Sequence, residues 1–259
     1  MPDFLDILVV DVVETLDKKY YDTIKKTTPQ SISLKEAIQN RCNSAIISEV
    51  KFASPSKGAI RGKNDLRGIV KNMEEGGAVG ISILAEPKHF GGNIGFIPEI
   101  RKDVNIPILM KDIILSPVQI DAASRAGANA VLLIQTIFDR GYCKKEAQEM
   151  IDHSHSTGLE VLLEAHTEEE FLSALQTNAD MIGINNRDLK TLKVDLEVTK
   201  SILSKHPVKN EVIVSESGIQ TPKDIRLLNR YGVKAFLVGT AIMKANNVKE
   251  KVKELAEAI

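Results

Sequence analysis

Apolar and charged residues form two kinds of segment that follow one another repeatedly along this chain. Short runs of apolar, often β-branched residues, such as residues 130–134 and 235–239, are typical of parallel strands that are buried on both faces. The runs lie roughly 20 to 35 residues apart, which is the spacing of strand–helix units. We therefore predict eight strands, which begin near Ala45, Val79, Pro107, Asn129, Leu159, Asp180, Glu211 and Lys234.

The segments between these strands carry the signals of helix starts and ends. Ser116 and Thr221 are each followed by proline, which favours an N-cap with proline in the first helical turn. Thr167, with Glu170 three residues later, predicts a capping box. Three glycines stand where helices should end before the next strand: Gly127, Gly158 and Gly232.

Two helices are expected before the first strand. Residues 3–26 place apolar side chains at helical spacing, with lysines near the C-terminal end, and residues 33–40 are predicted to form a second, short helix. The chain shows no linker or low-complexity segment, so we expect one domain over residues 1–259, with 1–44 as an N-terminal helical extension. The apolar positions of the first helix are Leu5, Leu8, Val9, Val12, Val13 and Leu16.

The order of these elements predicts the fold class. Eight strands, each followed by a helix, in about 215 residues close most naturally into an α/β fold of the (β/α)8, or TIM-barrel, type. An open, doubly wound sheet is the structural alternative. It fits less well because no Gly-x-Gly-x-x-Gly motif follows the first strand.

Composition and charge exclude several classes of function. The net charge is −1, the charges are interspersed, and aromatic residues make up only 4% of the chain, so we expect no nucleic-acid partner. Cys42 and Cys143 form no C-x-x-C motif, which suits a reducing cytoplasm. The first residues are acidic and no apolar run is long enough to span a bilayer, so we expect neither a signal peptide nor a membrane. No metal site is expected, because His153 and His155 would not share a helix face.

Charged residues gather where the predicted strands end, which is where active sites form in this type of barrel. Glu49 and Lys51 lie two apart and therefore share one face of the first strand. Lys111 ends the third strand and Glu164 ends the fifth. Because residues of one barrel layer come from alternate strands, two acids and two bases can meet at one mouth, as acid–base catalysis requires. The alternative is a ring of ion pairs that only closes the barrel.

The ends of the last two predicted strands suggest a phosphate site. Ser217-Gly218 and Gly239-Thr240 allow backbone N–H groups to approach an anion closely, and a short helix could begin at Thr240. The loops after strands seven and eight are a frequent phosphate position in this fold. These glycines could equally be plain turn residues.

Two histidines have more than one interpretation. His166 could be a further acid–base group, but a loop residue just before the capping Thr167 is the simpler interpretation. His89 lies in a loop after the second strand that could move and cover the site. Phe90 beside it could form an apolar wall for an aromatic ligand or pack beneath the loop.

Taken together, the strand ends resemble those of the indole-3-glycerol-phosphate synthase family. The motifs include Ile-Ile-Ser-Glu-Val-Lys-Phe-Ala-Ser-Pro-Ser-Lys-Gly and Pro-Ile-Leu-Met-Lys-Asp, and they recur in order from about residue 45 to 245. The N-terminal helices also fit the extra segment of that family. The matching segments are 46–58, 82–92, 107–112, 127–134, 159–164, 182–189 and 214–219.

The resemblance implies an activity. The family cyclises 1-(2-carboxyphenylamino)-1-deoxyribulose 5-phosphate, with loss of carbon dioxide and water, to indole-3-glycerol phosphate in tryptophan biosynthesis, without cofactor or metal. It further implies a cytoplasmic enzyme, a monomer or weak homodimer, with other tryptophan-pathway enzymes as potential partners. The implied catalytic residues are Glu49, Lys51, Lys111, Glu164 and Asn185.

The resemblance also implies roles for these residues. Lys111 is expected to protonate the ketone oxygen of the substrate during ring closure, and Lys51 to pair with the anthranilate carboxylate and to be available for the later dehydration. Glu164 is expected to act as acid–base partner and to stabilise an iminium-like cation, while Glu49 holds one of the lysines. Which lysine serves which step stays open.

The implied binding residues fall into two groups. Arg187 and Ser217 are expected to line the pocket, and the apolar residues to form a slot for the benzene ring. The phosphate residues are Ser54, Ser217, Gly218, Gly239 and Thr240, and the slot residues are Phe90, Leu132, Leu189 and Leu237. The chain departs from the family at Ile113, where an aromatic residue is usual, and Phe52 and Ala53 are a smaller variation.

Three other functions compete with this interpretation. One is a Schiff-base aldolase that uses Lys51 or Lys111 as nucleophile. The second is the sister isomerase of the same pathway, whose cysteine–aspartate acid–base pair has no counterpart in this sequence. The third is a barrel that binds the phosphorylated ligand without turning it over.

Overall fold

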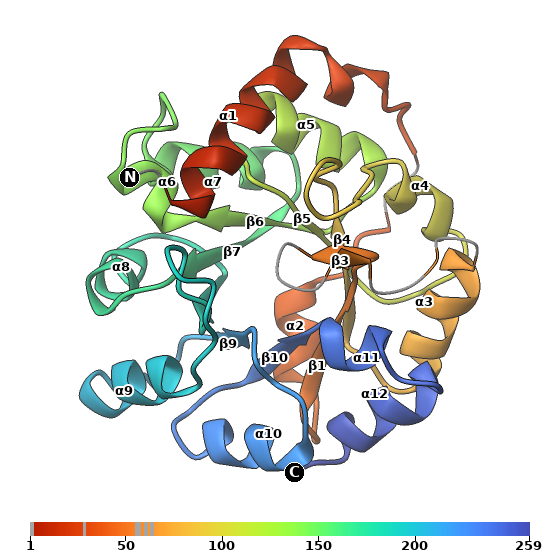
Figure 1. The fold of residues 1–259 in the computed structure, drawn as a ribbon, viewed down its shortest axis with the longest axis vertical. Helices are drawn as coiled ribbons and strands as arrows, with labels where there is room; N and C mark the ends of the chain where they lie inside the picture. Colours follow the sequence, from red (N-terminus) through yellow and green to blue (C-terminus); the bar gives the residue numbers. More distant parts are fainter. Residues whose placement is uncertain (1–2, 28–29, 55–57, 60–61, 63–64) are drawn as a thin grey trace.

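Eight parallel strands form a closed barrel in the computed structural model, which describes residues 3–27, 30–54, 58–59, 62 and 65–259 (Figure 1). Each strand begins within two residues of its predicted start, so the (β/α)8 prediction is confirmed. The last strand pairs with the first, with Ala235 opposite Ala45. In barrel order the strands are β1 (Ala45–Val50), β4 (Gly80–Leu84), β5 (Ile108–Lys111), β6 (Ala130–Ile134), β7 (Glu160–Ala165), β8 (Met181–Asn185), β9 (Ile213–Glu216) and β10 (Ala235–Val238).

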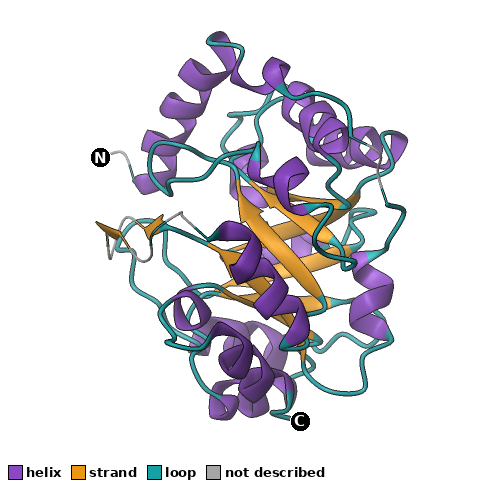
Figure 2. Ribbon diagram, turned by 90° about the vertical axis from the view of Figure 1, so that its right-hand side faces the viewer, coloured by secondary structure: helices purple, strands orange, loops and turns teal. Residues whose placement is uncertain are grey.

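Helices surround the strands on the outside (Figure 2). The Ser116 and Thr221 starts are confirmed: both are N-caps with proline in the first turn. Thr167 is also an N-cap, but Glu170 accepts the His166 N–H rather than that of Thr167, so the predicted capping box is wrong in that half. The helices are α3 (Leu66–Glu75), α4 (Phe96–Ile100), α5 (Pro117–Ala126), α6 (Gln135–Asp139), α7 (Ala147–Ser156), α8 (Glu168–Ala174), α9 (Glu197–Lys205), α10 (Pro222–Asn229), α11 (Thr240–Met243) and α12 (Val248–Ala256).

The N-terminal extension contains α1 (Phe4–Asp17), the 3₁₀-helix η1 (Tyr20–Thr23) and α2 (Leu34–Gln39). The short second helix is confirmed, but the prediction of one helix over 3–26 is wrong beyond Asp17. Lys19 adopts a left-handed backbone conformation with φ of 55°, which turns the chain out of the helix. The turn allows Tyr21 to enter the core, where its hydroxyl donates to Asp112 Oδ2 at 2.7 Å.

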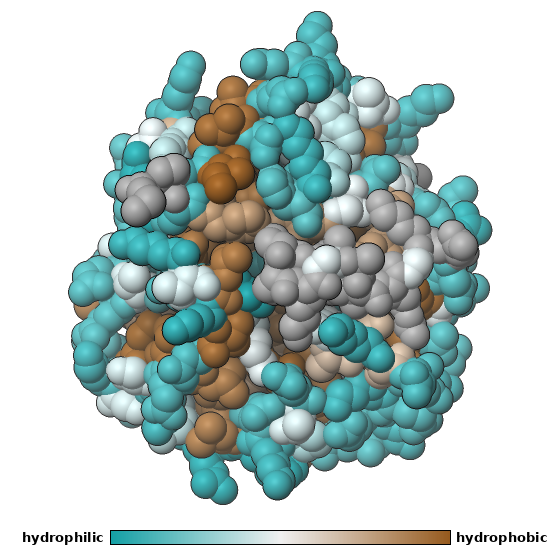
Figure 3. Space-filling view, viewed as in Figure 1, coloured by the Kyte–Doolittle hydropathy of each residue, from teal (hydrophilic) through white to brown (hydrophobic). Residues whose placement is uncertain are grey.

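The apolar stripe of α1 only partly faces the core. Leu5, Leu8 and Val12 are buried, whereas Val13, which was predicted to lie on the same face, is 47% exposed. Figure 3 shows hydrophobic side chains over α1 and down the middle of the face that Figure 1 presents. Among the described residues, no helix is both long and apolar enough to cross a membrane.

One element was missed by the strand prediction. A small antiparallel pair, β2 (Ala53–Ser54) and β3 (Gly58–Ala59), follows β1. Two-residue strands are too short to produce a recognisable alternation of apolar and polar residues. The pair lies next to the end of the first barrel strand, and therefore beside the mouth.

Candidate active site

Four alternate strands of the barrel deliver one charged side chain each to the same cavity. These are Glu49 from β1, Lys111 from β5, Glu164 from β7 and Glu216 from β9, which we call the mouth cluster. Side chains of one layer come from alternate strands of a (β/α)8 barrel, so the layer rule places all four at one level. The cavity has a volume of about 1080 Å³ and contains all five predicted catalytic residues in its lining.

Lys111 lies between two carboxylates. Its Nζ is 2.8 Å from Glu164 Oε2 and 2.8 Å from Glu216 Oε2. Both glutamate side chains are almost fully buried, at 4% and 1% exposure, while the lysine retains 17%. The lysine is therefore held in one position while part of it still faces the cavity.

A second ion pair lies at the end of β1. Lys51 Nζ is 2.7 Å from Glu49 Oε1, which confirms that these two residues share a face. A Cβ at Gly239 would lie 2.4 Å from Glu49 Oε1, and one at Gly183 would lie 2.3 Å from Glu216 Oε1. The absence of side chains at Gly183 and Gly239 thus makes room for the two glutamates.

Burial and mutual charge set the protonation of the mouth cluster. Burial opposes ionisation of Glu164, but attraction to Lys111 and then to His166 outweighs it and lowers the pKa of this carboxyl. For Glu216, burial dominates and, with repulsion from Glu164, raises the pKa to about 8. Burial also disfavours the charge of Lys111, but the three surrounding glutamates together raise its pKa. The cluster therefore combines an ionised Glu164, a protonated Glu216 and a cationic Lys111 at neutral pH.

The loop after β8 brings Asn185 and Arg187 to the cavity. Asn185 Oδ1 accepts the Arg187 N–H at 3.0 Å, and Arg187 Nη1 donates to the Leu192 carbonyl at 2.9 Å. The neighbouring Asn186 is buried and donates from Nδ2 to Ser215 Oγ and to the Glu216 carbonyl, at 3.0 and 2.9 Å. These contacts hold the ends of β8 and β9 together.

The predicted phosphate residues also line the cavity. Ser217 and Gly218 both have positive φ angles, 63° and 90°, so the chain turns sharply directly after Glu216. A non-glycine residue in this conformation is strained, and such strain is common at functional sites. Gly239 and Thr240 precede and begin α11, as predicted, and Lys244 and Lys251 lie in the same lining. Ser54 is in β2, but its side chain lies outside the described residues.

The apolar part of the lining contains more than the sequence suggested. All four predicted slot residues are present, and Ile113 is among their neighbours in the lining. The N-terminal helix also contributes, with Phe4, Leu5 and Leu8, although the extension had been assigned no part in the site. The predicted residues are Phe90, Leu132, Leu189 and Leu237.

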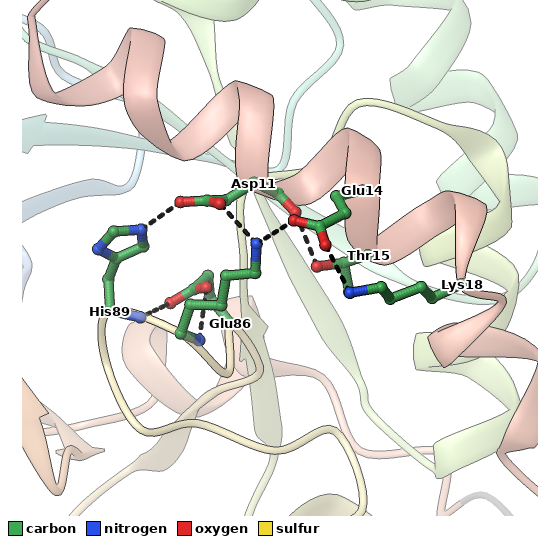
Figure 4. Close-up of polar contacts among 7 residues, drawn as sticks. Asp11, Glu14, Thr15, Lys18, Glu86 and His89 are labelled. Atoms are coloured by element: carbon green, nitrogen blue, oxygen red, sulfur yellow. Dashed lines mark hydrogen bonds and ion pairs between the residues drawn. The ribbon is translucent and has the colours of Figure 1, made fainter.

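A second group of charges ties α1 to the loop after β4 (Figure 4). Lys88 Nζ lies 2.5 Å from both Asp11 and Glu14, and His89 Nε2 lies 2.6 Å from Asp11. We call Asp11, Glu14, Lys88 and His89 the α1–loop cluster. Glu86 accepts three successive N–H groups of this loop, from residues 88, 89 and 90, at 2.7 to 3.1 Å.

The α1–loop cluster shows where His89 lies in relation to the cavity. Its ring packs edge-on against Phe4, with centroids 5.6 Å apart, and it is not part of the cavity lining. Phe90 does line the cavity, as an apolar wall would require, and its ring also packs against Phe4. In this structure the loop is docked against α1.

Glu216 is the residue that sequence reasoning missed. Among the sequence motifs it stands only inside the matching segment 214–219, yet it contacts Lys111 as closely as Glu164 does. The signal was available, since the layer rule that selected the first, third and fifth strands also selects the seventh. Among the described residues, no group of three or more His, Cys, Asp or Glu side chains is arranged to hold a metal ion.

Comparison with protein families gives one clear match. The family model described as indole-3-glycerol phosphate synthase matches residues 9–255. A relative of this name from Caldanaerobacter subterraneus subsp. tengcongensis is 43% identical over 221 residues, which is 83% of each chain. A second, from Methanocaldococcus jannaschii, is 42% identical over 253 residues, covering 97% of this chain and 88% of the relative.

Solved structures support the fold alone. A thiamine phosphate pyrophosphorylase from Pyrococcus furiosus superposes with a TM-score of 0.60 and covers 87% of this chain and 97% of its own. Its sequence is only 18% identical. Barrels of this type serve many different reactions, so this likeness carries no statement about chemistry.

Proposed function

The chain belongs to the indole-3-glycerol phosphate synthase family, and on that premise we propose which residues carry out each part of the reaction. It is a decarboxylating lyase of tryptophan biosynthesis. It closes the pyrrole ring of 1-(2-carboxyphenylamino)-1-deoxyribulose 5-phosphate and releases carbon dioxide and water to form indole-3-glycerol phosphate.

Lys111 is the general acid of ring closure. When the aromatic carbon attacks the ketone, negative charge develops on the ketone oxygen, and a cation within hydrogen-bond reach stabilises it. The two contacts of 2.8 Å to Glu164 and Glu216 support this role, because they keep the lysine charged and in place. The developing alkoxide is a strong base, so even an ammonium group with a raised pKa can protonate it.

Glu164 faces the positive charge that develops on the substrate. Its lowered pKa keeps it ionised, which suits stabilisation of the iminium-like intermediate and acceptance of a proton afterwards. We also assign Glu216 to the catalytic set, because its Oε2 lies 2.8 Å from Lys111 Nζ. With a pKa raised to about 8, it holds a proton at neutral pH and can reprotonate Lys111 after the lysine has given its own proton to the ketone oxygen.

Lys51 and Glu49 serve the carboxylate end of the substrate. Lys51 is 14% exposed at the cavity and pairs with Glu49, so it can exchange that partner for the anthranilate carboxylate and later assist dehydration. Asn185 and Arg187 provide further polar contacts from the neighbouring strand. Loss of the carboxylate as carbon dioxide then returns Lys51 to Glu49.

The phosphate binds at Ser217, Gly218, Gly239 and Thr240, with Ser54 as a further contact from the predicted set. The shared lining of these four residues with Lys244 and Lys251 supports the placement. Phe90, Leu132, Leu189 and Leu237 receive the benzene ring, with Ile113 in place of an aromatic neighbour. The cytoplasmic location, the oligomeric state and association with other pathway enzymes stay predictions.

The placement of Lys111 between two carboxylates is the observation that carries these assignments. It also argues against the aldolase rival, because a Schiff-base lysine must lose its proton and is helped by a neighbouring cation rather than by acids. The test is a fluorescence assay for the indole product with synthetic substrate, run with and without borohydride. We expect full turnover and no trapped adduct; a trapped lysine adduct would contradict the acid–base role.

A further inference from the structure

The imidazole of His166 lies between two carboxylates behind the mouth of the barrel. His166 directly follows β7, its side chain is only 7% exposed, and its Nε2 is 3.2 Å from Glu164 Oε1. On its other side, Nδ1 is 3.6 Å from Glu170 Oε2. The ring does not belong to the cavity lining, so it reaches the reaction only through Glu164.

Glu170 is itself fixed from two elements. Its Oε1 accepts the hydroxyl of Thr136 in α6 at 2.7 Å, and its Oε2 accepts the backbone N–H of His166 at 2.6 Å. Its side chain is 11% exposed. A carboxylate anchored in this way gives the imidazole a rigid neighbour on the side away from the cavity.

The two oxygens of Glu164 therefore face two different groups. Oε2 contacts Lys111 at 2.8 Å, and Oε1 faces His166. Neither ring nitrogen of His166 has a hydrogen bond of regular geometry within the described part of the chain. A buried imidazole without such a bond is costly, whereas a leucine of similar size would fill the same space without that cost. The histidine thus has a polar task that packing does not explain.

We propose that His166 is a positioning residue for Glu164: it donates from Nε2 to Glu164 Oε1, while Glu170 lies on the opposite side of the ring and anchors the His166 backbone N–H. The donation fixes the orientation of the Glu164 carboxylate and favours its ionised form. The other charged groups around this carboxylate are Lys111, Glu216 and, farther off, Arg187. This inference rests on the proposed role of Glu164.

The test compares His166→Leu, which removes the donor, with His166→Gln, which retains one. For His166→Leu we expect kcat to fall roughly 10-fold with KM changed little, a smaller loss than that of a general acid–base group. The acidic limb of the kcat/KM–pH profile should move to higher pH, because Glu164 then takes up a proton more readily. His166→Gln should restore most of the turnover, which a purely space-filling role does not predict.

His206→Leu is the matched control. His206 directly follows α9 and pairs with Glu168 of α8, the helix that also contains Glu170, with 2.8 Å between Nε2 and Oε1. His206 lies outside the cavity lining. This variant should have the pH profile and turnover of the parent. Thermal melts of all variants separate lost activity from lost folding.

The Glu164→Gln and His166→Leu double mutant distinguishes a failure of the role proposed for Glu164 from a failure of the role proposed for His166. If Glu164→Gln leaves turnover near the parental value, the proposed role of Glu164 fails. If Glu164→Gln is strongly impaired, His166→Leu should add less than about 2-fold to that loss, since both changes remove the same interaction. A folded His166→Leu variant with the parental kcat and pH profile would overturn the role of His166 alone.

Discussion

The mouth cluster and the α1–loop cluster contain the same kinds of charged residue in different surroundings. In the mouth cluster, Glu164 and Glu216 are 4% and 1% exposed, whereas Lys88 and Glu14 of the α1–loop cluster are 36% and 50% exposed. Both clusters place one lysine between two carboxylates at hydrogen-bond distance. The two clusters therefore differ in how deeply their side chains are buried and not in the contacts of their lysines.

This difference decides what each cluster can do. In the mouth cluster, one carboxyl has a lowered pKa and its neighbour a raised one, so a proton is available at neutral pH. In the α1–loop cluster, contact with Lys88 lowers the pKa of Asp11, and contacts with Lys18 and then Lys88 lower the pKa of Glu14, so both stay ionised. Exposed ion pairs of this kind stabilise a protein only slightly, so we interpret this cluster as a structural contact between α1 and the loop.

The largest effect should come from removing the lysine of the mouth cluster. Lys111→Ala is expected to lower turnover by at least about two orders of magnitude, because the general acid is lost. The measurement is kcat from the fluorescence of the indole product. Lys249→Ala is the control, since Lys249 forms an exposed pair with Glu75 and is absent from the cavity lining. Activity within a few-fold of the parent would remove Lys111 from its assigned role.

The protonated state of Glu216 should be visible in stability. Its pKa is raised to about 8 from an ordinary value near 4.5, so the folded state holds a proton that the unfolded state has lost between these values. The free energy of unfolding should therefore fall with rising pH across this window in the parent, relative to Glu216→Gln. Urea titrations of both proteins at several pH values measure this. Parallel curves would show that Glu216 is already ionised in the folded protein.

Ile113→Phe changes the cavity wall without altering the charge of either cluster. A ring at this position regains stacking against the benzene ring of the substrate, worth on the order of 0.5–1.5 kcal/mol. KM should fall accordingly, while the pH profile stays that of the parent. A higher KM in a stably folded variant would mean that the slot has no room for a second ring, since Ile113 is only 8% exposed.

The smallest effect should come from the α1–loop cluster. Asp11→Asn weakens contacts to both Lys88 and His89, and we expect KM to rise by no more than about 5-fold, with kcat unchanged, because exposed pairs contribute about 0.2–1 kcal/mol. Added salt should raise the KM of the parent more than that of the variant. Glu75→Gln serves as the control. A large loss of kcat would show that the α1–loop cluster takes part in catalysis, contrary to its interpretation as a structural contact.

How far the sequence predicts this site depends on the distance between partners along the chain. The strand ends are predictable because each βα unit repeats the same pattern, so Glu49, Lys111 and Glu164 could be assigned to one mouth before any coordinates were known. The same rule, applied once more, would have included Glu216. The fold and the position of the mouth cluster thus follow from local patterns and one packing rule.

The contacts of the extension could not be predicted in this way. Asp11 and Lys88 are 77 residues apart in the sequence, and Tyr21 and Asp112 are 91 residues apart. Neither segment contains a pattern that predicts the other as its partner. The end of α1 at Asp17 was equally hidden, because the lysines that follow are good helix formers and no local pattern marks the left-handed turn at Lys19 that brings Tyr21 into the core. Tertiary contacts decided these points.

The pairing of β10 with β1 also fixes when the enzyme first becomes active during its own synthesis. The ribosome makes β1 early, but Ala45 has no neighbour on that side until Ala235 has left the exit tunnel. Until then the nascent chain has an open strand edge, which can pair with other chains, and it lacks Gly239 and Thr240. Closure of the barrel and completion of the proposed phosphate site by Gly239 and Thr240 therefore both come late, and we expect a chain that ends before β10 to be inactive and prone to aggregate.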